Sequence, residues 1–136
     1  MKVFVWPLRV YYEDTDSSGV VYYANYLKFM ERARTEWLRA LGFEQDRLAR
    51  DLGILFVVRS VALDYHYPAR FNDALAVHSR ICEARRASLT FGQDVVEVEK
   101  GAVLCRGWIK IACVSADAFK ARPIPTMIVE AMGDAS

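Results

Sequence analysis

Two acidic side chains, Asp14 and Asp16, lie between a predicted strand and a predicted helix, in the segment 13–22. A helix start offers backbone N–H groups without intrahelical partners and the positive end of the helix dipole. A carboxylate beside it could attack an acyl carbonyl, or deprotonate an attacking water, while the N–H groups stabilise the oxyanion. In an extended segment, two side chains at this spacing would point to the same side. From spacing alone, however, Asp and Ser before a helix more commonly act as caps and turn residues.

No other arrangement of nucleophile and base competes with this acidic segment. The two histidines, His66 and His78, both fall in later predicted strands, where a structural or surface role is the better interpretation. The three cysteines, Cys82, Cys105 and Cys113, form no Cys-x-x-Cys pair, which argues against a zinc site or a disulfide framework. All three are expected to be buried free thiols in a reducing cytosol. We therefore expect no metal and no redox cofactor.

A paired-arginine turn, Arg85-Arg86-Ala87-Ser88, is the second feature with chemical potential. Two guanidinium groups and a hydroxyl at one strand junction could hold a phosphate. A solvated turn accounts for the same residues equally well.

Aromatic residues near the acidic segment could line an acyl pocket or fill the core, and both can hold because pockets are largely apolar. They are Tyr11, Tyr12, Tyr22, Tyr23, Tyr26 and Phe29.

The N-terminal part of the chain must position the acidic segment. Residues 3–12 are rich in β-branched and aromatic types and predict a strand, with Pro7 at a sheet edge or a bulge. A helix is predicted from about residues 22–25 to Leu41, where apolar residues recur at three- and four-residue spacing and charged residues lie mostly off that row. Its start is apolar almost all round, so we expect a sheet to enclose it. Residues 44–51 could form a second short helix.

From Ile54 onwards the hydrophobic period changes to two, which predicts strands. The expected strands are 54–67, 75–82, 89–99 and 103–115, with a hairpin turn at Lys100-Gly101. Residues 126–132 form either a short helix or a strand. This order indicates an α+β fold in which a curved antiparallel sheet of about five strands wraps around one long central helix. Such sheets often pair at their edges, so a dimer or larger assembly is expected.

Composition excludes several classes of function. The chain has 136 residues, of which 54% are hydrophobic and 26% charged, as in an ordinary globular domain, and we expect one domain over residues 1–136. A net charge of +1 argues against a general nucleic-acid surface. The apolar run at the N-terminus is too short for a signal peptide, and no uncharged stretch is long enough to span a membrane. A cytoplasmic location is therefore expected.

Several motifs along the chain resemble one known family. They are Arg9-Val-Tyr-Tyr-Glu-Asp-Thr-Asp, Gly19-Val-Val-Tyr, Asn25-Tyr26, Glu31-Arg32-Ala33-Arg34-Thr35-Glu36, Phe56-Val57-Val58-Arg59 and Tyr67-Pro68-Ala69-Arg70. On these residues the chain resembles hotdog-fold acyl-CoA thioesterases of the 4-hydroxybenzoyl-CoA thioesterase group. It is most similar to the YbgC branch, which is associated with the Tol-Pal envelope system. The resemblance covers nearly the whole chain and is weakest from about Ala84 to Val103 and at the last few residues.

The resemblance implies a hotdog fold with active sites at the interface of a homodimer, or of a dimer of dimers that forms a homotetramer. It implies hydrolysis of an acyl-CoA thioester to a free acid and CoA. Asp16 would be the catalytic carboxylate, and the backbone N–H of Tyr23 would be the oxyanion donor. The CoA phosphates would lie at Arg85, Arg86 and Ser88, although Ala87 stands where some relatives carry another basic residue. Asp14 would instead shape the loop.

Other interpretations remain open. Glu31 is a possible second carboxylate, but a solvated or ion-paired helix residue is the better interpretation. A hydratase of the same fold would need a His near the helix, and no His precedes His66. The chain could also be a non-catalytic partner that binds acyl-CoA or acyl-carrier protein in envelope or phospholipid metabolism. The sequence does not decide between nucleophilic and general-base roles for Asp16, between CoA and carrier protein, or between acyl groups.

Overall fold

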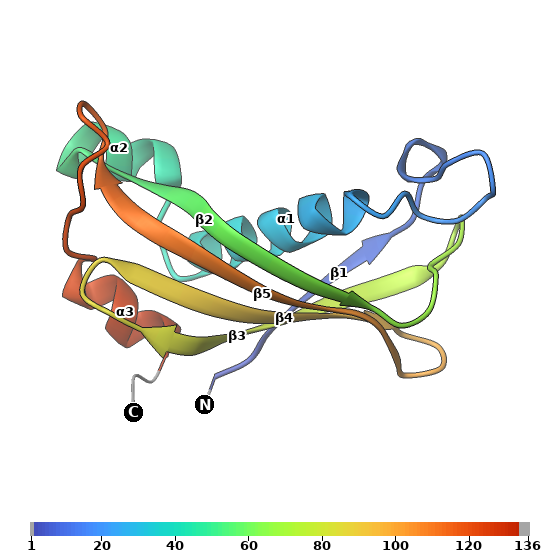
Figure 1. The fold of residues 1–136 in the computed structure, drawn as a ribbon. Helices are drawn as coiled ribbons and strands as arrows, with labels where there is room; N and C mark the ends of the chain where they lie inside the picture. The colour runs from blue at the N-terminus through green and yellow to red at the C-terminus, as the bar shows by residue number, and fades with distance from the viewer. Residues whose placement is uncertain (1, 134–136) are drawn as a thin grey trace.

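An antiparallel sheet of five strands, in the order β1-β3-β4-β5-β2, forms the frame of the molecule. The computed structural model describes residues 2–133. The sheet curves around one long helix, as Figure 1 shows, and this confirms the predicted α+β architecture. The strands are β1 (Phe4–Arg9), β2 (Ile54–Tyr65), β3 (Ala74–Ala84), β4 (Ser88–Glu97) and β5 (Ala102–Ser115). The helices are α1 (Asn25–Ala40), α2 (Gln45–Leu52) and α3 (Thr126–Met132).

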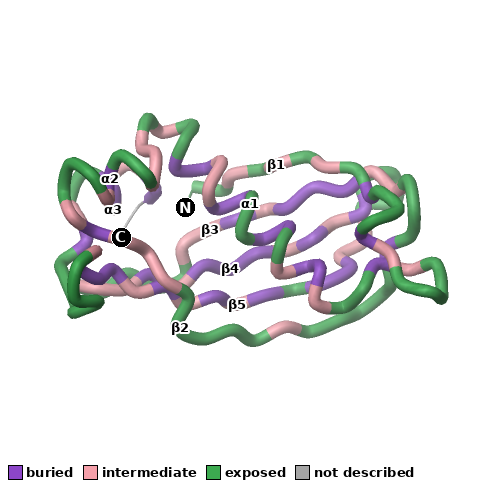
Figure 2. The backbone as a smooth tube through the Cα atoms, turned by 90° about the horizontal axis from the view of Figure 1, so that it is seen from above, coloured by how far each residue is buried: buried purple, intermediate pink, exposed green. Residues whose placement is uncertain are grey.

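Helix α1 is held in the concave side of the sheet by its apolar face. Tyr26, Met30, Ala33 and Trp37, which form one row on the helix, are all buried. Figure 2 shows buried residues along α1 and the central strands, whereas the edge strand β2 is mostly exposed and the residues of β1 alternate between intermediate and exposed. Gly107 of β5 lies under the helix, where a Cβ would come within 2.8 Å of the Met30 side chain. The absent side chain therefore allows α1 to approach the sheet closely.

Some boundaries differ from the prediction because local hydrogen bonds end the strands early. β1 ends at Arg9, since Tyr12–Asp14 form a 3₁₀ turn and Asp14 accepts the backbone N–H of Tyr11. β2 ends at Tyr65, and the amides of the next two residues both donate to the carbonyl of Leu104. Residues 126–132, for which helix and strand were both open, form α3.

Two side chains depart from the expected environment. Arg34 belongs to the charged set expected mostly off the apolar row of the helix, yet it is only 8% exposed. It is buried because its guanidinium donates to Gln93 Oε1 on β4 at 2.9 Å. Among the cysteines, Cys105 and Cys113 are buried free thiols as expected, but Cys82 is exposed near the end of β3, on the face opposite the helix.

Within residues 2–133, none of the helices has the length and apolar character needed to cross a bilayer. The predicted single domain covers residues 1–136, of which residues 1 and 134–136 lie outside the described part.

Candidate active site

The acidic segment folds into a small paired loop between β1 and α1, called the elbow here (residues 11–24). Its two arms pair through an isolated bridge between Thr15 and Val21, and Val20 forms a further bridge with Arg70 after β2. The backbone N–H of Asp16 donates to Val20 O, and the N–H of Tyr22 donates to Asp14 O. Asp16 therefore lies toward the tip of the loop, and Tyr23 lies at its base.

Asp14 is a structural residue at the base of the elbow. Its side chain is 7% exposed and accepts hydrogen bonds from Tyr11 N at 2.9 Å and Asn25 Nδ2 at 2.8 Å. The expectation that Asp14 and Asp16 point to the same side is wrong, because the 3₁₀ turn replaces the extended backbone which that expectation needs. The carboxylate of Asp14 links β1, the elbow and the first residue of α1, which agrees with its expected role in shaping the loop.

Asp16 is exposed and sits at the first position of a tight turn. The N–H of Gly19 donates to Asp16 O, and Gly19 has a φ of 83°, which a glycine adopts at low cost. The Asp16 carboxylate accepts hydrogen bonds from the Ser18 hydroxyl and from the Ser18 backbone N–H. These bonds, with the hydroxyl as the larger cause, lower the pKa of Asp16 below its usual value. Asp16 is thus ionised at neutral pH.

The start of α1 leaves backbone donors available. Its N-cap is Ala24, which has no side-chain capping bond, and the first turn contains no acidic residue. Asp16 is therefore not the cap of this helix. Within residues 2–133, the backbone N–H groups of Tyr23 and Ala24 have no hydrogen-bond acceptor. Free N–H groups at the positive end of a helix dipole are suited to stabilise an oxyanion.

A pocket of about 260 Å³ opens beside this helix start. It is lined by Val21, Tyr23, Tyr26, Tyr65, His66, Tyr67 and Pro68. The Tyr65 hydroxyl donates to Tyr23 O at 2.8 Å, and the N–H of Ala69 donates to the buried Tyr26 hydroxyl at 3.0 Å. Burial raises the pKa of both tyrosines. The end of β2 and the segment after it therefore fix the backbone that carries the free N–H groups.

The paired-arginine turn lies at the other end of the sheet. β3 begins at Ala74, which pairs with Arg9 beside the elbow, and runs 11 residues to Ala84 before this turn. At about 3.3 Å per residue, the elbow and the turn are roughly 35 Å apart. Figure 1 shows the two at opposite ends of the molecule. One chain therefore does not bring Arg85, Arg86 and Ser88 next to Asp16 and Tyr23.

Arg85 already has an anionic partner within the chain. Its Nε donates to Glu83 Oε1 at 3.0 Å and its Nη2 to Glu83 Oε2 at 3.3 Å, and this carboxylate raises the pKa of Arg85. The backbone of the turn is also fixed, because Arg86 O accepts the N–H of Ile124 and Arg85 N donates to Ser88 O. The turn thus presents Arg86 as its more available guanidinium.

Comparison with known proteins assigns the family. Residues 18–104 match the family model of the thioesterase superfamily. An acyl-CoA thioester hydrolase, YbgC, from Escherichia coli O6:H1 is 43% identical over 93% of this chain and 93% of its own length. A probable thioesterase from Bartonella henselae superposes with a TM-score of 0.85 at 34% identity, over 91% of this chain and 100% of that one. A 1,4-dihydroxy-2-naphthoyl-CoA thioesterase from Synechocystis shares the fold, with a TM-score of 0.91 at 23% identity over 98% of both chains.

The chain belongs to the thioesterase superfamily. The suspected relationship to the YbgC branch and the hotdog fold are thereby confirmed.

Three hydrogen bonds of the candidate site were not predicted from the sequence. Asn25 holds Asp14, Ser18 holds Asp16, and Tyr65 holds the carbonyl of Tyr23. The run Tyr65-His66-Tyr67-Pro68 at the end of a strand was a usable signal, because aromatic residues clustered before a strand-ending proline often line a pocket. Asn25 belongs to the motif Asn25-Tyr26, but the motif does not indicate its bond to Asp14, which lies 11 residues earlier.

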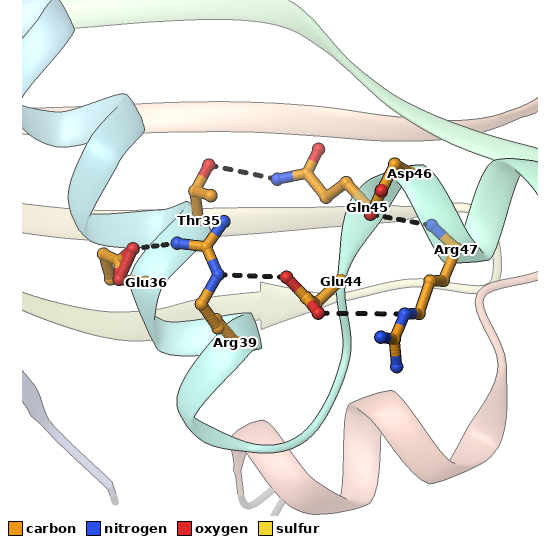
Figure 3. A network of polar contacts seen from close by, with 7 residues as sticks. All are labelled: Thr35, Glu36, Arg39, Glu44, Gln45, Asp46 and Arg47. Carbon is orange, nitrogen blue, oxygen red and sulfur yellow. Dashed lines mark hydrogen bonds and ion pairs between the residues drawn. The ribbon is translucent and has the colours of Figure 1, made fainter.

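The other prominent polar cluster of this thioesterase-superfamily chain is structural. Figure 3 shows two contacts between the end of α1 and the start of α2, Arg39 with Glu44 and Thr35 with Gln45. Each side is also braced within its own segment, since Glu36 bonds Arg39 and Glu44 pairs with Arg47. Arg39 Nε lies 3.2 Å from Glu44 Oε1, and Gln45 Nε2 donates to Thr35 Oγ1 at 3.1 Å. These contacts orient α2 at the end of α1 far from the elbow. Across residues 2–133, no group of three or more His, Cys, Asp or Glu side chains is arranged to hold a metal ion.

Proposed function

We propose that this chain is an acyl-CoA thioesterase, which hydrolyses an acyl-CoA thioester to a free carboxylic acid and CoA without a metal or redox cofactor. Its similarity to relatives named acyl-CoA thioester hydrolase and acyl-CoA thioesterase supports the substrate class. A structural neighbour from Staphylococcus aureus, 13% identical, is described in complex with CoA. The observation that carries the proposal is the elbow, where an ionised Asp16 and the free N–H of Tyr23 belong to one short loop.

In the proposed reaction, the thioester carbonyl points at the start of α1. The N–H of Tyr23 and the helix dipole polarise the carbonyl and stabilise the oxyanion that forms. Asp16 either attacks the carbonyl carbon and gives a mixed anhydride, or takes a proton from the attacking water. Both routes need the ionised carboxylate, which its lowered pKa provides at neutral pH.

An isotope experiment separates these two routes. In single-turnover hydrolysis in ¹⁸O-labelled water, an anhydride intermediate that is hydrolysed at the aspartyl carbonyl leaves label in the Asp16 carboxylate. A general-base route puts the label only in the released acid. Mass spectrometry of the peptide that contains Asp16 distinguishes the two outcomes.

We further propose that the complete site forms between two copies of the chain, in a cytoplasmic homodimer or homotetramer. Asp16 and Tyr23 lie at one end of the sheet and the paired-arginine turn lies about 35 Å away, so one copy cannot supply both to one CoA ester. In a two-fold arrangement, the elbow of one copy can face the turn of the other. Arg86, with Arg85 and Ser88, would then contact the CoA phosphates.

Replacement of Asp16 by Asn tests the catalytic assignment. The amide can neither attack nor accept a proton, so we expect kcat to fall by at least about 100-fold across a panel of acyl-CoA esters. The matched control is Asp117→Asn, which changes another exposed turn aspartate outside the elbow. Both variants should keep the wild-type melting temperature and CoA affinity. Unchanged turnover in Asp16→Asn would exclude the catalytic role, and CoA binding by a wild-type protein that hydrolyses no ester would favour a non-catalytic binding partner.

The paired-arginine turn is tested with two substrates that share one acyl group. The double variant Arg85→Ala/Arg86→Ala should raise KM for the CoA ester about tenfold or more, because charge-assisted contacts to phosphate are lost. KM for the corresponding pantetheine ester, which lacks the nucleotide phosphates, should stay within about twofold. Equal effects on both esters would remove the turn from the binding site.

A further inference from the structure

We infer that Ser18 is a positioning residue for the reaction: it orients the Asp16 carboxylate and leaves Oδ2 as the reacting oxygen. This inference rests on the proposed function and adds a residue and a reacting atom to it. Ser18 itself touches no reacting atom, so it acts through Asp16.

The two hydrogen bonds to the carboxylate end on the same oxygen. The Ser18 backbone N–H donates to Asp16 Oδ1 at 2.9 Å, and the Ser18 hydroxyl donates to Oδ1 as well. Within residues 2–133, no donor is bonded to Oδ2. Two bonds to one oxygen fix the rotation of the carboxylate, because turning it would break both. Oδ2 is consequently the oxygen that remains open to a substrate carbonyl or a water.

The turn backbone does not depend on the Ser18 hydroxyl. It is closed by Gly19 N to Asp16 O at 3.0 Å and by Asp16 N to Val20 O at 2.9 Å, and it continues into the bridge between Thr15 and Val21. The Ser18 side chain is exposed and has no other partner within residues 2–133. Loss of the hydroxyl should therefore free the carboxylate while the loop keeps its path.

In either proposed route, Oδ2 of Asp16 is the oxygen that reacts. In the nucleophilic route, Oδ2 forms a bond to the acyl carbon, the C–S bond breaks, and the CoA thiolate takes a proton from solvent. Water then hydrolyses the mixed anhydride, which releases the free acid and restores the Asp16 carboxylate. In the general-base route, Oδ2 accepts a proton from water, the water oxygen bonds to the acyl carbon, the C–S bond breaks, and the proton on Oδ2 passes to the departing CoA thiolate. In both routes the two donors at Oδ1 hold the carboxylate in its ionised form until the reaction.

The test compares Ser18→Ala with Ser17→Ala, its neighbour in the same turn, whose side chain has no bond to Asp16. Thioester hydrolysis is measured from acidic to mildly alkaline pH. We expect Ser18→Ala to lower the plateau kcat about tenfold with little change in KM. The acid limb of kcat/KM should move to higher pH, because the hydroxyl that lowers the Asp16 pKa is gone. Ser17→Ala should match the wild type.

Two further variants keep the inference falsifiable if Ser18→Ala folds poorly. Ser18→Thr keeps the hydroxyl and should restore both kcat and the acid limb. Ser18→Cys has a weaker donor of similar size and should fall between wild type and Ser18→Ala. If a folded Ser18→Ala, or Ser18→Cys in its place, follows the wild-type pH profile, the inference is overturned, as it is if Ser17→Ala has the same effect. The proposed function stands in those cases as long as Asp16→Asn is inactive, and it fails separately if Asp16→Asn is active.

Discussion

Asp14 and Asp16 show how two like residues separated by one position acquire different properties. Asp14 is buried against the amide of Asn25, so its carboxylate serves to join the elbow to α1. Asp16 is exposed and bonded only within its own turn, so its carboxylate stays accessible. The 3₁₀ turn over Tyr12–Asp14 is what sends one side chain inward and the other outward. The division of roles between them follows from that turn.

At the residue scale, we predict that the Tyr65 hydroxyl supports the reaction by holding the backbone carbonyl of Tyr23. Tyr65→Phe removes the bond to Tyr23 O and keeps the ring, so the backbone that carries the free N–H should become less ordered. We expect kcat to fall about three- to tenfold, which corresponds to the loss of one ordinary hydrogen bond. Burial raises the pKa of Tyr65, so its hydroxyl remains a donor through neutral pH and the effect should not depend on pH there.

The matched control for this effect is Tyr67→Phe. Tyr67 lines the same pocket, but its hydroxyl has no hydrogen-bond partner within residues 2–133. Its kcat should stay within about twofold of the wild type. An equal loss of kcat in both variants would mean that the hydroxyls act on the pocket as a whole and not through the Tyr23 peptide.

The two proposed reacting groups could be predicted from the sequence, but the residues that orient them could not. Asp16 and the N–H of Tyr23 followed from an acidic loop before a helix and from a family resemblance. Ser18, Asn25 and Tyr65 depend on side-chain directions set by the 3₁₀ turn and by the position of β2 beside α1. A one-dimensional pattern does not contain those directions. Cys82 was assigned to the core for the same reason, because an alternating strand has a buried and an exposed face.

At the scale of elements, α1 is fixed on the sheet by a buried polar cluster as well as by apolar contacts. Gln93 is fully buried on β4, accepts from Arg34, and donates to Met30 O and to Ser79 Oγ at 2.9 Å each. Burial lowers the pKa of Arg34 to about 10, so the guanidinium is still charged at neutral pH. Such a charge is costly to bury unless its hydrogen bonds are satisfied.

Gln93→Leu should therefore be strongly destabilising. It leaves the Arg34 cation and the Met30 and Ser79 acceptors without their partner, and we expect the free energy of unfolding to fall by about 3–5 kcal/mol. The double variant Arg34→Met/Gln93→Leu removes the buried charge too and should be more stable than Gln93→Leu alone. Urea denaturation measures both, with the exposed Arg39→Met as a control expected to change by at most about 1 kcal/mol.

A double variant no more stable than Gln93→Leu would show that the buried charge is not the source of the lost stability.

The cluster also marks a limit of prediction from sequence. Hydrophobic periodicity predicted α1 and the strands, because one apolar face must be buried in each. It gave no sign that Arg34 and Gln93, 59 residues apart, would meet in the core.

At the scale of the whole molecule, β2 is a 12-residue edge strand whose outer side has no partner within residues 2–133. Two of its valines are substantially exposed, Val58 by 53% and Val61 by 41%. Exposed apolar residues on a long edge strand are a feature that a second copy commonly covers. This is the edge through which we expect two copies to associate.

Charge on this edge should prevent association. In Val58→Lys/Val61→Lys, burying two ammonium groups at an interface is unfavourable, so we expect a folded monomer by light scattering or sedimentation. Hydrolysis of CoA esters should fall steeply in the monomer if the site needs two copies. The control Val5→Lys changes an equally exposed residue of β1, the opposite edge, and should leave assembly unchanged. A fully active monomer would contradict the two-copy site.

The separation of the elbow from the paired-arginine turn has a consequence for mixtures of different chains. If each site takes its elbow from one copy and its arginines from the other, a chain defective in one part is repaired by a chain defective in the other. Subunit exchange between Asp16→Asn and Arg85→Ala/Arg86→Ala proteins would create hybrids in which one site carries both lesions and the other carries none. Two impaired populations would then recover activity on mixing, and a cell that holds one allele of each kind would keep a working enzyme.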